Sequence, residues 1–279
     1  MPKYPIDKLI TDFDETISER DTISTLVHTA ADNRAHEKEE FLAAWQEMVQ
    51  WFLTRYYRVC DAWQDHRHSL VDYLKSFEEL ETASIQRVIA KGFLEGLTRE
   101  GLRAVGRNVI KKPGVDRVLS RLRRDGVEIE ILSANWSEAL IQGATEGLCD
   151  RVITNSLQYD AAGRSTGDIH LHVVSARDKL REFRLRKKNP PNPDEIGDGG
   201  APRTLYIGDS ISDFLAILDA DLGVLIGQNR TAMQTIERFH LPTQRLQEGT
   251  RFDSSRHYQG TILLIDSWKV LDDFLLTAE

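Results

Sequence analysis

The amino-acid sequence predicts an α/β fold, a doubly wound parallel sheet, with an all-helical domain inserted after the first strand. Short apolar runs of strand length alternate with helical segments in the second half of the chain, which is typical of a parallel sheet with helices on both faces. The stretch from Asp21 to Gly106 instead has long helical periodicity and almost no strand pattern. We therefore expect a core domain from residues 1–18 and 110–279 and a helical cap from residues 19–109.

The elements follow from hydrophobic periodicity and from turn residues. Residues 9–14 form a short apolar strand that ends in carboxylates. In the insert, one helix begins at Thr22, and others are expected over residues 37–63, 80–94 and 100–109. Later strands are expected over residues 127–132, 151–154, 205–207, 222–226 and 262–265. Later helices are expected over residues 115–124, 137–146, 177–185 and 211–218, with a last one capped by Ser267.

Composition excludes several classes of protein. The chain has 44 acidic and 36 basic residues, a net charge of −8, which argues against a general nucleic-acid binder. Cys60 and Cys149 are its two cysteines, too few for a disulfide scaffold. No targeting segment is visible at the N-terminus and no apolar run approaches the roughly 18 residues of a membrane span. We expect a cytoplasmic protein that binds neither nucleic acid nor membrane.

The first group of candidate catalytic residues stands where the first strand ends. Asp12 and Asp14 lie two residues apart there, and open α/β sheets place their sites at the carboxyl ends of strands. Two such carboxylates repel each other unless a cation lies between them or one binds a proton. The pair therefore suits a nucleophile beside a general acid/base.

Three further groups follow later strands. Ser133 offers a hydroxyl, with free backbone amides beside it, directly after a strand, which suits an anion. Lys179 is a compact positive charge at the start of a helix. Asp209 and Asp213 are four residues apart and offer the oxygen ligands that Mg²⁺ prefers. Taken singly, the Asp12 and Asp14 pair is typical of a solvated loop, Ser133 of a helix N-cap and Lys179 of a surface lysine. The order of the four groups on successive strand ends favours one site.

The order Asp-x-Asp-x-Thr, Ser, Lys and Gly-Asp-Ser-x-x-Asp resembles the haloacid dehalogenase superfamily of phosphatases, which implies a Rossmann-like core. The helical insert resembles that family's C1-type cap, as in relatives of phosphoserine phosphatase. Residues 132–137 and 205–223 are also similar to the phosphatase domain of plant thiamin monophosphate phosphatases.

The resemblance implies a role for each matching residue. Asp12 would attack phosphorus to form an aspartyl-phosphate, and Asp14 would act as general acid and base. Phosphate-binding roles fall to Thr16, Ser133, Ala134, Asn135 and Lys179. A Mg²⁺ ion would be held by Asp12, the Asp14 carbonyl, Asp209 and Asp213. Because the dehalogenases of the superfamily lack the acid at Asp14, phosphoester chemistry is the better interpretation.

Four residues are candidates for substrate specificity: Glu15, Trp45, Tyr56 and Trp136. Many family members have glycine where this chain has Glu15, so its side chain would narrow the site or add negative charge. Most cap aromatics pack between helices, but one or two would stack on a flat substrate ring. Trp136 directly follows the Ser133 motif, which favours a place near the site.

The predicted function is Mg²⁺-dependent hydrolysis of a small phosphorylated metabolite. Thiamin monophosphate or a related aminopyrimidine phosphate is the leading substrate. The alternatives are a phosphorylated amino acid, sugar or nucleotide, a phosphotransferase or ATPase, and a non-catalytic binding protein that kept the fold. Complete retention of the motif residues argues against the last.

Three weaker patterns have ordinary structural interpretations. His170 and His172 would share a face of one strand, and a metal site there would need a third ligand that the sequence does not supply. Residues 66–68 hold two histidines, expected in a solvated turn of the cap or facing the substrate. Residues 187–202 are rich in proline and glycine, as in a solvated loop.

Overall fold

A parallel sheet forms the core of the molecule. The computed structural model describes residues 4–34, 36–63, 69–187 and 203–276. Within them, seven strands pair in the order β4-β3-β1-β7-β8-β10-β9, all in parallel. The strands are β1 (Lys8–Thr11), β3 (Glu128–Leu132), β4 (Arg151–Ile153), β7 (Thr204–Gly208), β8 (Leu222–Ile226), β9 (Thr243–Arg245) and β10 (Ile262–Ile265). The predicted fold class is confirmed, and β9 is a strand that the sequence pattern missed.

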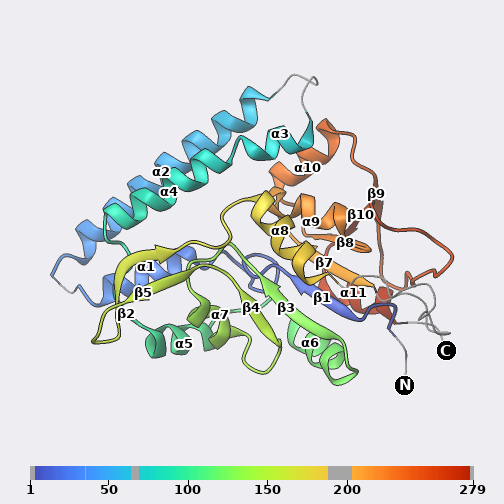
Figure 1. Ribbon diagram of the computed structural model, residues 1–279, viewed down its shortest axis with the longest axis horizontal. Helices are drawn as coiled ribbons and strands as arrows, with labels where there is room; N and C mark the ends of the chain where they lie inside the picture. The colour runs from blue at the N-terminus through green and yellow to red at the C-terminus, as the bar shows by residue number, and fades with distance from the viewer. Residues whose placement is uncertain (1–3, 35, 64–68, 188–202, 277–279) are drawn as a thin grey trace.

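Helices cover both faces of this sheet (Figure 1). Leu9 of β1 belongs to one apolar cluster and the next residue, Ile10, to another, because successive side chains of a strand point to opposite faces. On the Leu9 side lie α6 (Val115–Arg124) and α11 (Trp268–Leu275). On the Ile10 side lie α8 (Ala176–Arg186) and α9 (Phe214–Asp219). This two-sided burial explains why the central strands are almost continuously apolar.

The register of the sheet brings the motifs together. Thr11, the last residue of β1, pairs with Ile131 of β3 and with Ile207 of β7. The residues just beyond these three strands therefore meet at one edge of the sheet. The motifs that begin at Asp12, Ser133 and Asp209 all start there.

The insert after β1 lies over the carboxyl edge of the sheet. Its long helices, α2 and α4, pack side by side (Figure 1). Its elements are α1 (Ile23–Asp32), α2 (Lys38–Ala62), α3 (Leu70–Lys75), α4 (Glu78–Ala90), β2 (Glu95–Thr98) and α5 (Arg99–Arg107). The domain boundaries drawn from the sequence stay a prediction.

The insert is not wholly helical, which corrects one detail of the prediction. Strand β2 pairs with β6 (Arg164–His170), which pairs with β5 (Ser156–Tyr159), in a three-stranded antiparallel sheet. Strand β2 has four residues and includes Gly96 at φ 81°, so its alternation is too short to stand out from the helical pattern around it. The helix expected over residues 80–94 ends at Ala90, before a turn at Gly92, where φ is 63°.

The far end of the cap contacts the core through α10 (Arg230–Arg238). The Arg238 guanidinium donates a hydrogen bond to the Cys60 carbonyl of α2, at 3.1 Å. Phe239 packs on Tyr73 of α3, with ring centroids 5.4 Å apart. These contacts hold the helix pair across the sheet edge, so that the cap covers the site.

The structure tests one of the three weaker patterns, the pair of histidines. His170 and His172 are exposed, and His172 pairs with Glu182 at 3.1 Å. Within the described ranges, the acidic and histidine groups close enough to hold a metal do not include either histidine. Residues 66–68 and 188–202 lie outside the described residues. Among the helices that the structure describes, none combines the length and the apolar character that crossing a bilayer requires.

Candidate active site

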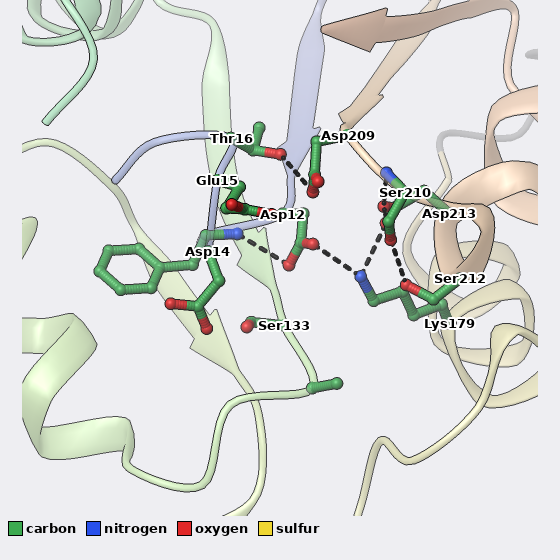
Figure 2. Close-up of polar contacts among 12 residues, drawn as sticks. Asp12, Asp14, Glu15, Thr16, Ser133, Lys179, Asp209, Ser210, Ser212 and Asp213 are labelled. Carbon is green, nitrogen blue, oxygen red and sulfur yellow. Dashed lines mark hydrogen bonds and ion pairs between the residues drawn. The ribbon is translucent and has the colours of Figure 1, made fainter. Parts of the chain in front are cut away.

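Asp12 is the residue around which the site is built. It follows β1 directly and is 5% exposed. One carboxylate oxygen accepts the Phe13 backbone N–H at 2.8 Å, and the other accepts a hydrogen bond from Lys179 Nζ at 2.8 Å (Figure 2). Burial raises the pKa of Asp12 to about 7, although the charge of Lys179 opposes this. The result is a carboxylate fixed in direction by two donors.

Lys179 links Asp12 to the second acidic motif. Its Nζ also donates to Asp213 Oδ1 at 2.7 Å, and the same oxygen accepts the Tyr206 hydroxyl at 2.7 Å. Burial by itself would lower the pKa of Lys179, but the charges of Asp12 and Asp213 outweigh it and hold this pKa above its ordinary value. Lys179 is therefore a buried, charged ammonium, placed by the first turn of α8 after the Ser175 N-cap.

Asp209 completes an acidic triad with Asp12 and Asp213. One carboxylate oxygen from each lies within 4.8 Å of the others. Burial first, and then the charges of Asp213 and Asp12, raise the pKa of Asp209 well above its ordinary value. A Cβ added at Gly208 would lie 2.2 Å from Asp213 Cγ, so glycine is needed there for the two motif ends to approach. Three buried oxygen ligands in mutual repulsion fit a divalent cation such as Mg²⁺.

Asp14 is held by a separate network. Its Oδ1 accepts the Thr22 backbone N–H at 2.8 Å and the Thr22 hydroxyl at 2.6 Å, and its Oδ2 accepts the Asn135 side-chain amide at 2.7 Å. Burial and the charge of Asp21 raise the pKa of Asp14 to about 6, against the lowering effect of these hydrogen bonds. A carboxyl with such a pKa can both give and take a proton near neutral pH.

The loop after β3 brings the second motif to Asp12 and Asp14 (Figure 2). Ser133 Oγ accepts the Asn135 backbone N–H at 3.1 Å. The Asn155 side-chain amide donates to the Ala134 carbonyl at 3.0 Å and to the Val173 carbonyl at 2.8 Å. These hydrogen bonds hold the loop in place. The Asn135 side-chain amide donates to Asp14 and Thr22 and so orients the acid; its role in binding phosphate stays a prediction.

A cavity of about 420 Å³ lies between this sheet edge and the cap. Most of the predicted site residues line it: Asp12, Asp14, Glu15, Trp45, Ser133, Ala134, Asn135, Trp136, Lys179 and Asp209. Thr16 stands behind it, donating to Asp209 at 3.4 Å. Tyr56 lies elsewhere, in a neighbouring cavity of about 220 Å³. The sequence-predicted residues are thus brought together, with Tyr56 set apart.

Glu15 has an unusual backbone. Its φ is 54°, in the left-handed region that glycine adopts without steric cost. The side chain is exposed and lines the cavity. The position at which many family members have glycine therefore has a glycine-like conformation, and here it adds a carboxylate to the lining of the cavity.

The sequence analysis missed several residues that shape this site. Thr22 donates a hydrogen bond to Asp14, and Asn155 donates one to the Val173 carbonyl. The fold brings these partners together, and no local sequence pattern indicates them. Tyr206 lies within an apolar strand, so in the sequence it resembles an ordinary core aromatic, and its hydrogen bond to Asp213 is not predicted. Glu81 of α4 lines the cavity from the cap. Its place depends on how the cap docks, which periodicity does not reveal.

A family model describes most of this arrangement. The model of haloacid dehalogenase-like hydrolases matches residues 9–217, from β1 into α9. The chain belongs to this family. The predicted enzyme class, a haloacid dehalogenase-family hydrolase, is confirmed, and the acidic triad stands where the phosphatase interpretation requires it.

Two curated proteins are similar in sequence. The mitochondrial bifunctional TH2 protein of Arabidopsis thaliana is 26% identical over 222 residues, covering 74% of this chain and 36% of the plant protein. This chain thus spans about a third of the plant protein's length. A CTO1 family protein of Schizosaccharomyces pombe is 25% identical over 254 residues, covering 82% of this chain and 85% of the yeast protein.

Solved structures share the fold. A hydrolase of the family from Salmonella enterica has a TM-score of 0.56 and 15% identity, covering 99% of this chain and 73% of its own. A Bordetella pertussis protein of unknown function has a TM-score of 0.55 and 14% identity, covering 93% and 97%. A substrate-bound phosphoserine phosphatase has a TM-score of 0.52 and 16% identity, covering 84% and 91%. At these identities the similarity shows the fold.

Proposed function

We propose that this protein is a Mg²⁺-dependent phosphomonoesterase that hydrolyses a small phosphorylated metabolite through an aspartyl-phosphate. The observation that supports this most is the position of Asp12. Its carboxylate faces a cavity, is aimed by Lys179 at 2.8 Å, and has a second carboxyl, Asp14, beside the same cavity. A positioned nucleophile next to a separate acid is what a two-step transfer requires.

The proposed reaction has two steps, and Asp12 and Asp14 act in both. In the first, an Asp12 carboxylate oxygen attacks phosphorus, the bond from phosphorus to the leaving oxygen breaks, and Asp14 gives that oxygen its proton. In the second, a water oxygen attacks phosphorus, Asp14 takes the water proton, and the bond from phosphorus to Asp12 breaks. The products are an alcohol, inorganic phosphate and the original carboxylate. Ser133, Lys179 and the loop amides would bind the phosphoryl oxygens throughout.

The metal would be held at the acidic triad. Asp12, Asp209 and the Asp14 carbonyl would be direct ligands. Asp213 accepts hydrogen bonds from Lys179, Tyr206 and Ser210, and is the most heavily hydrogen-bonded carboxylate of the triad. Asp213 would thus act on the waters around the ion. When bound, Mg²⁺ supplies positive charge against the oxygens of the transferring phosphoryl group.

Thiamin monophosphate or a related aminopyrimidine phosphate is the proposed substrate. The motif resemblance to plant thiamin monophosphate phosphatases supports it, and so does the aromatic lining of the cavity by Trp45, Phe52 and Trp136, which suits a flat ring. A phosphorylated amino acid, sugar or nucleotide remains the alternative.

Trapping the covalent intermediate tests this proposal. In Asp14→Asn, p-nitrophenyl phosphate should still phosphorylate Asp12, since its leaving group needs no proton, while the second step lacks its base. Intact-protein mass spectrometry after an acid quench should then show a phosphorylated chain, and Asp12→Asn should show none. Phosphate release from Asp14→Asn without any covalent species would contradict the aspartyl-phosphate route.

A further inference from the structure

The charges around the cavity are unevenly distributed. Within the part of the chain that the structure describes, Lys179 is the single basic residue of the lining, and it is committed to Asp12 and Asp213. Besides the triad and Asp14, the lining holds three more carboxylates, from Glu15, Asp21 and Glu81. Among the described residues of the lining, a second negative group on a substrate would therefore find no further basic side chain.

Glu81 differs from the other acids because it comes from the cap. It lies on α4, is half-buried, and borders both the catalytic cavity and the neighbouring one that holds Tyr56. Among the described residues, no hydrogen-bond donor contacts its carboxylate, and Lys179 is its one charged neighbour of opposite sign. Burial raises the pKa of Glu81 to about 7. Leaving a carboxylate desolvated without a partner costs free energy, and a bound ligand would supply that partner.

The two cavities that Glu81 borders have aromatic residues in their lining. Phe52 borders the same two cavities, and Trp45 and Trp136 line the catalytic one. Trp45 is held edge-on against Phe93, with centroids 5.3 Å apart, so its ring is fixed before a ligand arrives. An aromatic face beside a carboxylate attracts a flat cation through both dispersion and cation–π interaction.

We propose that Glu81 is a specificity-determining residue that binds a positive charge on the leaving group. The preferred substrate class is then a phosphate monoester of a flat, cationic alcohol. This inference rests on the proposed phosphatase function and names the substrate class of its site. It disfavours phosphorylated amino acids and nucleotides with further phosphates, because their extra negative groups would face Glu81, Asp21 and Glu15.

A pair of substrates that differ in charge tests the inference. 3-Methylbenzyl phosphate and (1-methylpyridinium-3-yl)methyl phosphate have the same shape, and the second carries a fixed positive charge. The wild-type protein should prefer the cation in kcat/KM by about tenfold or more. In Glu81→Gln the preference should fall to about twofold or less, through a higher KM for the cation.

Glu79→Gln is the matched control. Glu79 lies two residues earlier on α4 and is exposed, so the same loss of charge should leave the cation preference within about twofold of wild type. An equal loss in both variants would overturn the inference, because it would show a general effect of net charge. An unchanged preference in Glu81→Gln would overturn it as well.

Binding separates this inference from the proposed function. Calorimetry on Asp12→Asn, alone and combined with Glu81→Gln, measures the affinity for both phosphates without turnover. A cation affinity that falls about tenfold in the double variant supports the role of Glu81 even if hydrolysis fails. Equal affinities of Asp12→Asn and the double variant for the cation contradict that role, while hydrolysis of 3-methylbenzyl phosphate by the wild type would still support the phosphatase.

Discussion

The two ends of the cavity are built differently. At the sheet edge, the main charges are paired: Lys179 with Asp12 and Asp213, and Asp14 with Thr22 and Asn135. At the cap, Glu81 faces the same cavity without a hydrogen-bond donor among the described residues. This difference supports the proposal that the core binds the phosphoryl group, whereas Glu81 of the cap binds a charge on the rest of the substrate.

Of the substitutions at the sheet-edge end of the cavity, removal of Lys179 should have the largest effect. Lys179→Met would leave Asp12 and Asp213 as buried carboxylates without a cation, which costs about 3–5 kcal/mol in other proteins. We expect kcat to fall by about 1,000-fold or more and thermal stability to drop. Phosphate-release kinetics and thermal denaturation measure both.

A second substitution shows whether charge is the reason. Lys179→Met combined with Asp213→Asn should recover part of the lost stability while activity stays low, because one unpaired carboxylate is gone. Lys75→Met, at an exposed site on α3, should change neither quantity. If the double variant were no more stable than Lys179→Met, the loss would come from packing and not from buried charge.

The acid Asp14 should depend on its hydrogen bonds. Thr22→Val keeps the shape of the side chain and removes the 2.6 Å hydrogen bond to Asp14. For an alkyl phosphate, we expect kcat to fall by about 10- to 100-fold, since a hydrogen bond to a charged group contributes about 1.5–3 kcal/mol. For p-nitrophenyl phosphate the fall should be smaller, because that leaving group needs less proton donation. Equal falls for both substrates would rule out a role through Asp14.

The carboxylates of the site should make the stability of the metal-free protein depend on pH. Burial raises the pKa of Asp12 to about 7 and of Asp14 to about 6, each from 3.8. Between the ordinary pKa of 3.8 and these raised values, the folded protein binds more protons than the unfolded chain. Without metal, its stability therefore falls as pH rises through this range. Mg²⁺ should offset this, so its effect on Tm should be larger by several degrees at about pH 8 than at about pH 5.

Thermal denaturation in Mg²⁺ and in EDTA measures this effect, and Asp209→Asn is the matched variant. The substitution removes one carboxylate of the triad and should reduce the gain in Tm from Mg²⁺ at high pH. A gain that is the same at both pH values, or the same in Asp209→Asn, would mean that Mg²⁺ binds elsewhere.

The smallest expected effect concerns the backbone at Glu15. A non-glycine residue at positive φ costs about 1–2 kcal/mol, and glycine loses about 0.5–1 kcal/mol more chain entropy on folding. Glu15→Gly should therefore raise the free energy of unfolding by about 0.5 kcal/mol, whereas Glu15→Ala, which keeps a Cβ, should not. Urea denaturation measures both, and a gain in Glu15→Ala as large as in Glu15→Gly would attribute the effect to the lost charge.

The comparison also explains what the sequence could reveal. Asp12, Ser133, Lys179 and Asp209 follow strands or begin helices, and the register of a parallel sheet brings such positions together, so local patterns sufficed. Glu81 lies within an amphipathic helix, and its meaning depends on how α4 docks over the sheet. Strand β2 and the hydrogen bonds of Thr22 likewise depend on contacts between distant segments, which no local periodicity encodes.

The most direct test of the central claim is phosphate release by wild-type protein and Asp12→Asn, with Mg²⁺ and with EDTA. The panel would hold thiamin monophosphate, pyridoxal phosphate, phosphoserine, nucleoside monophosphates and the two benzylic phosphates. We predict Mg²⁺-dependent release that is strongest for a cationic aromatic monoester and absent in Asp12→Asn. Equal release by wild type and by folded Asp12→Asn, or no release from any compound by folded wild type with Mg²⁺, would contradict the account.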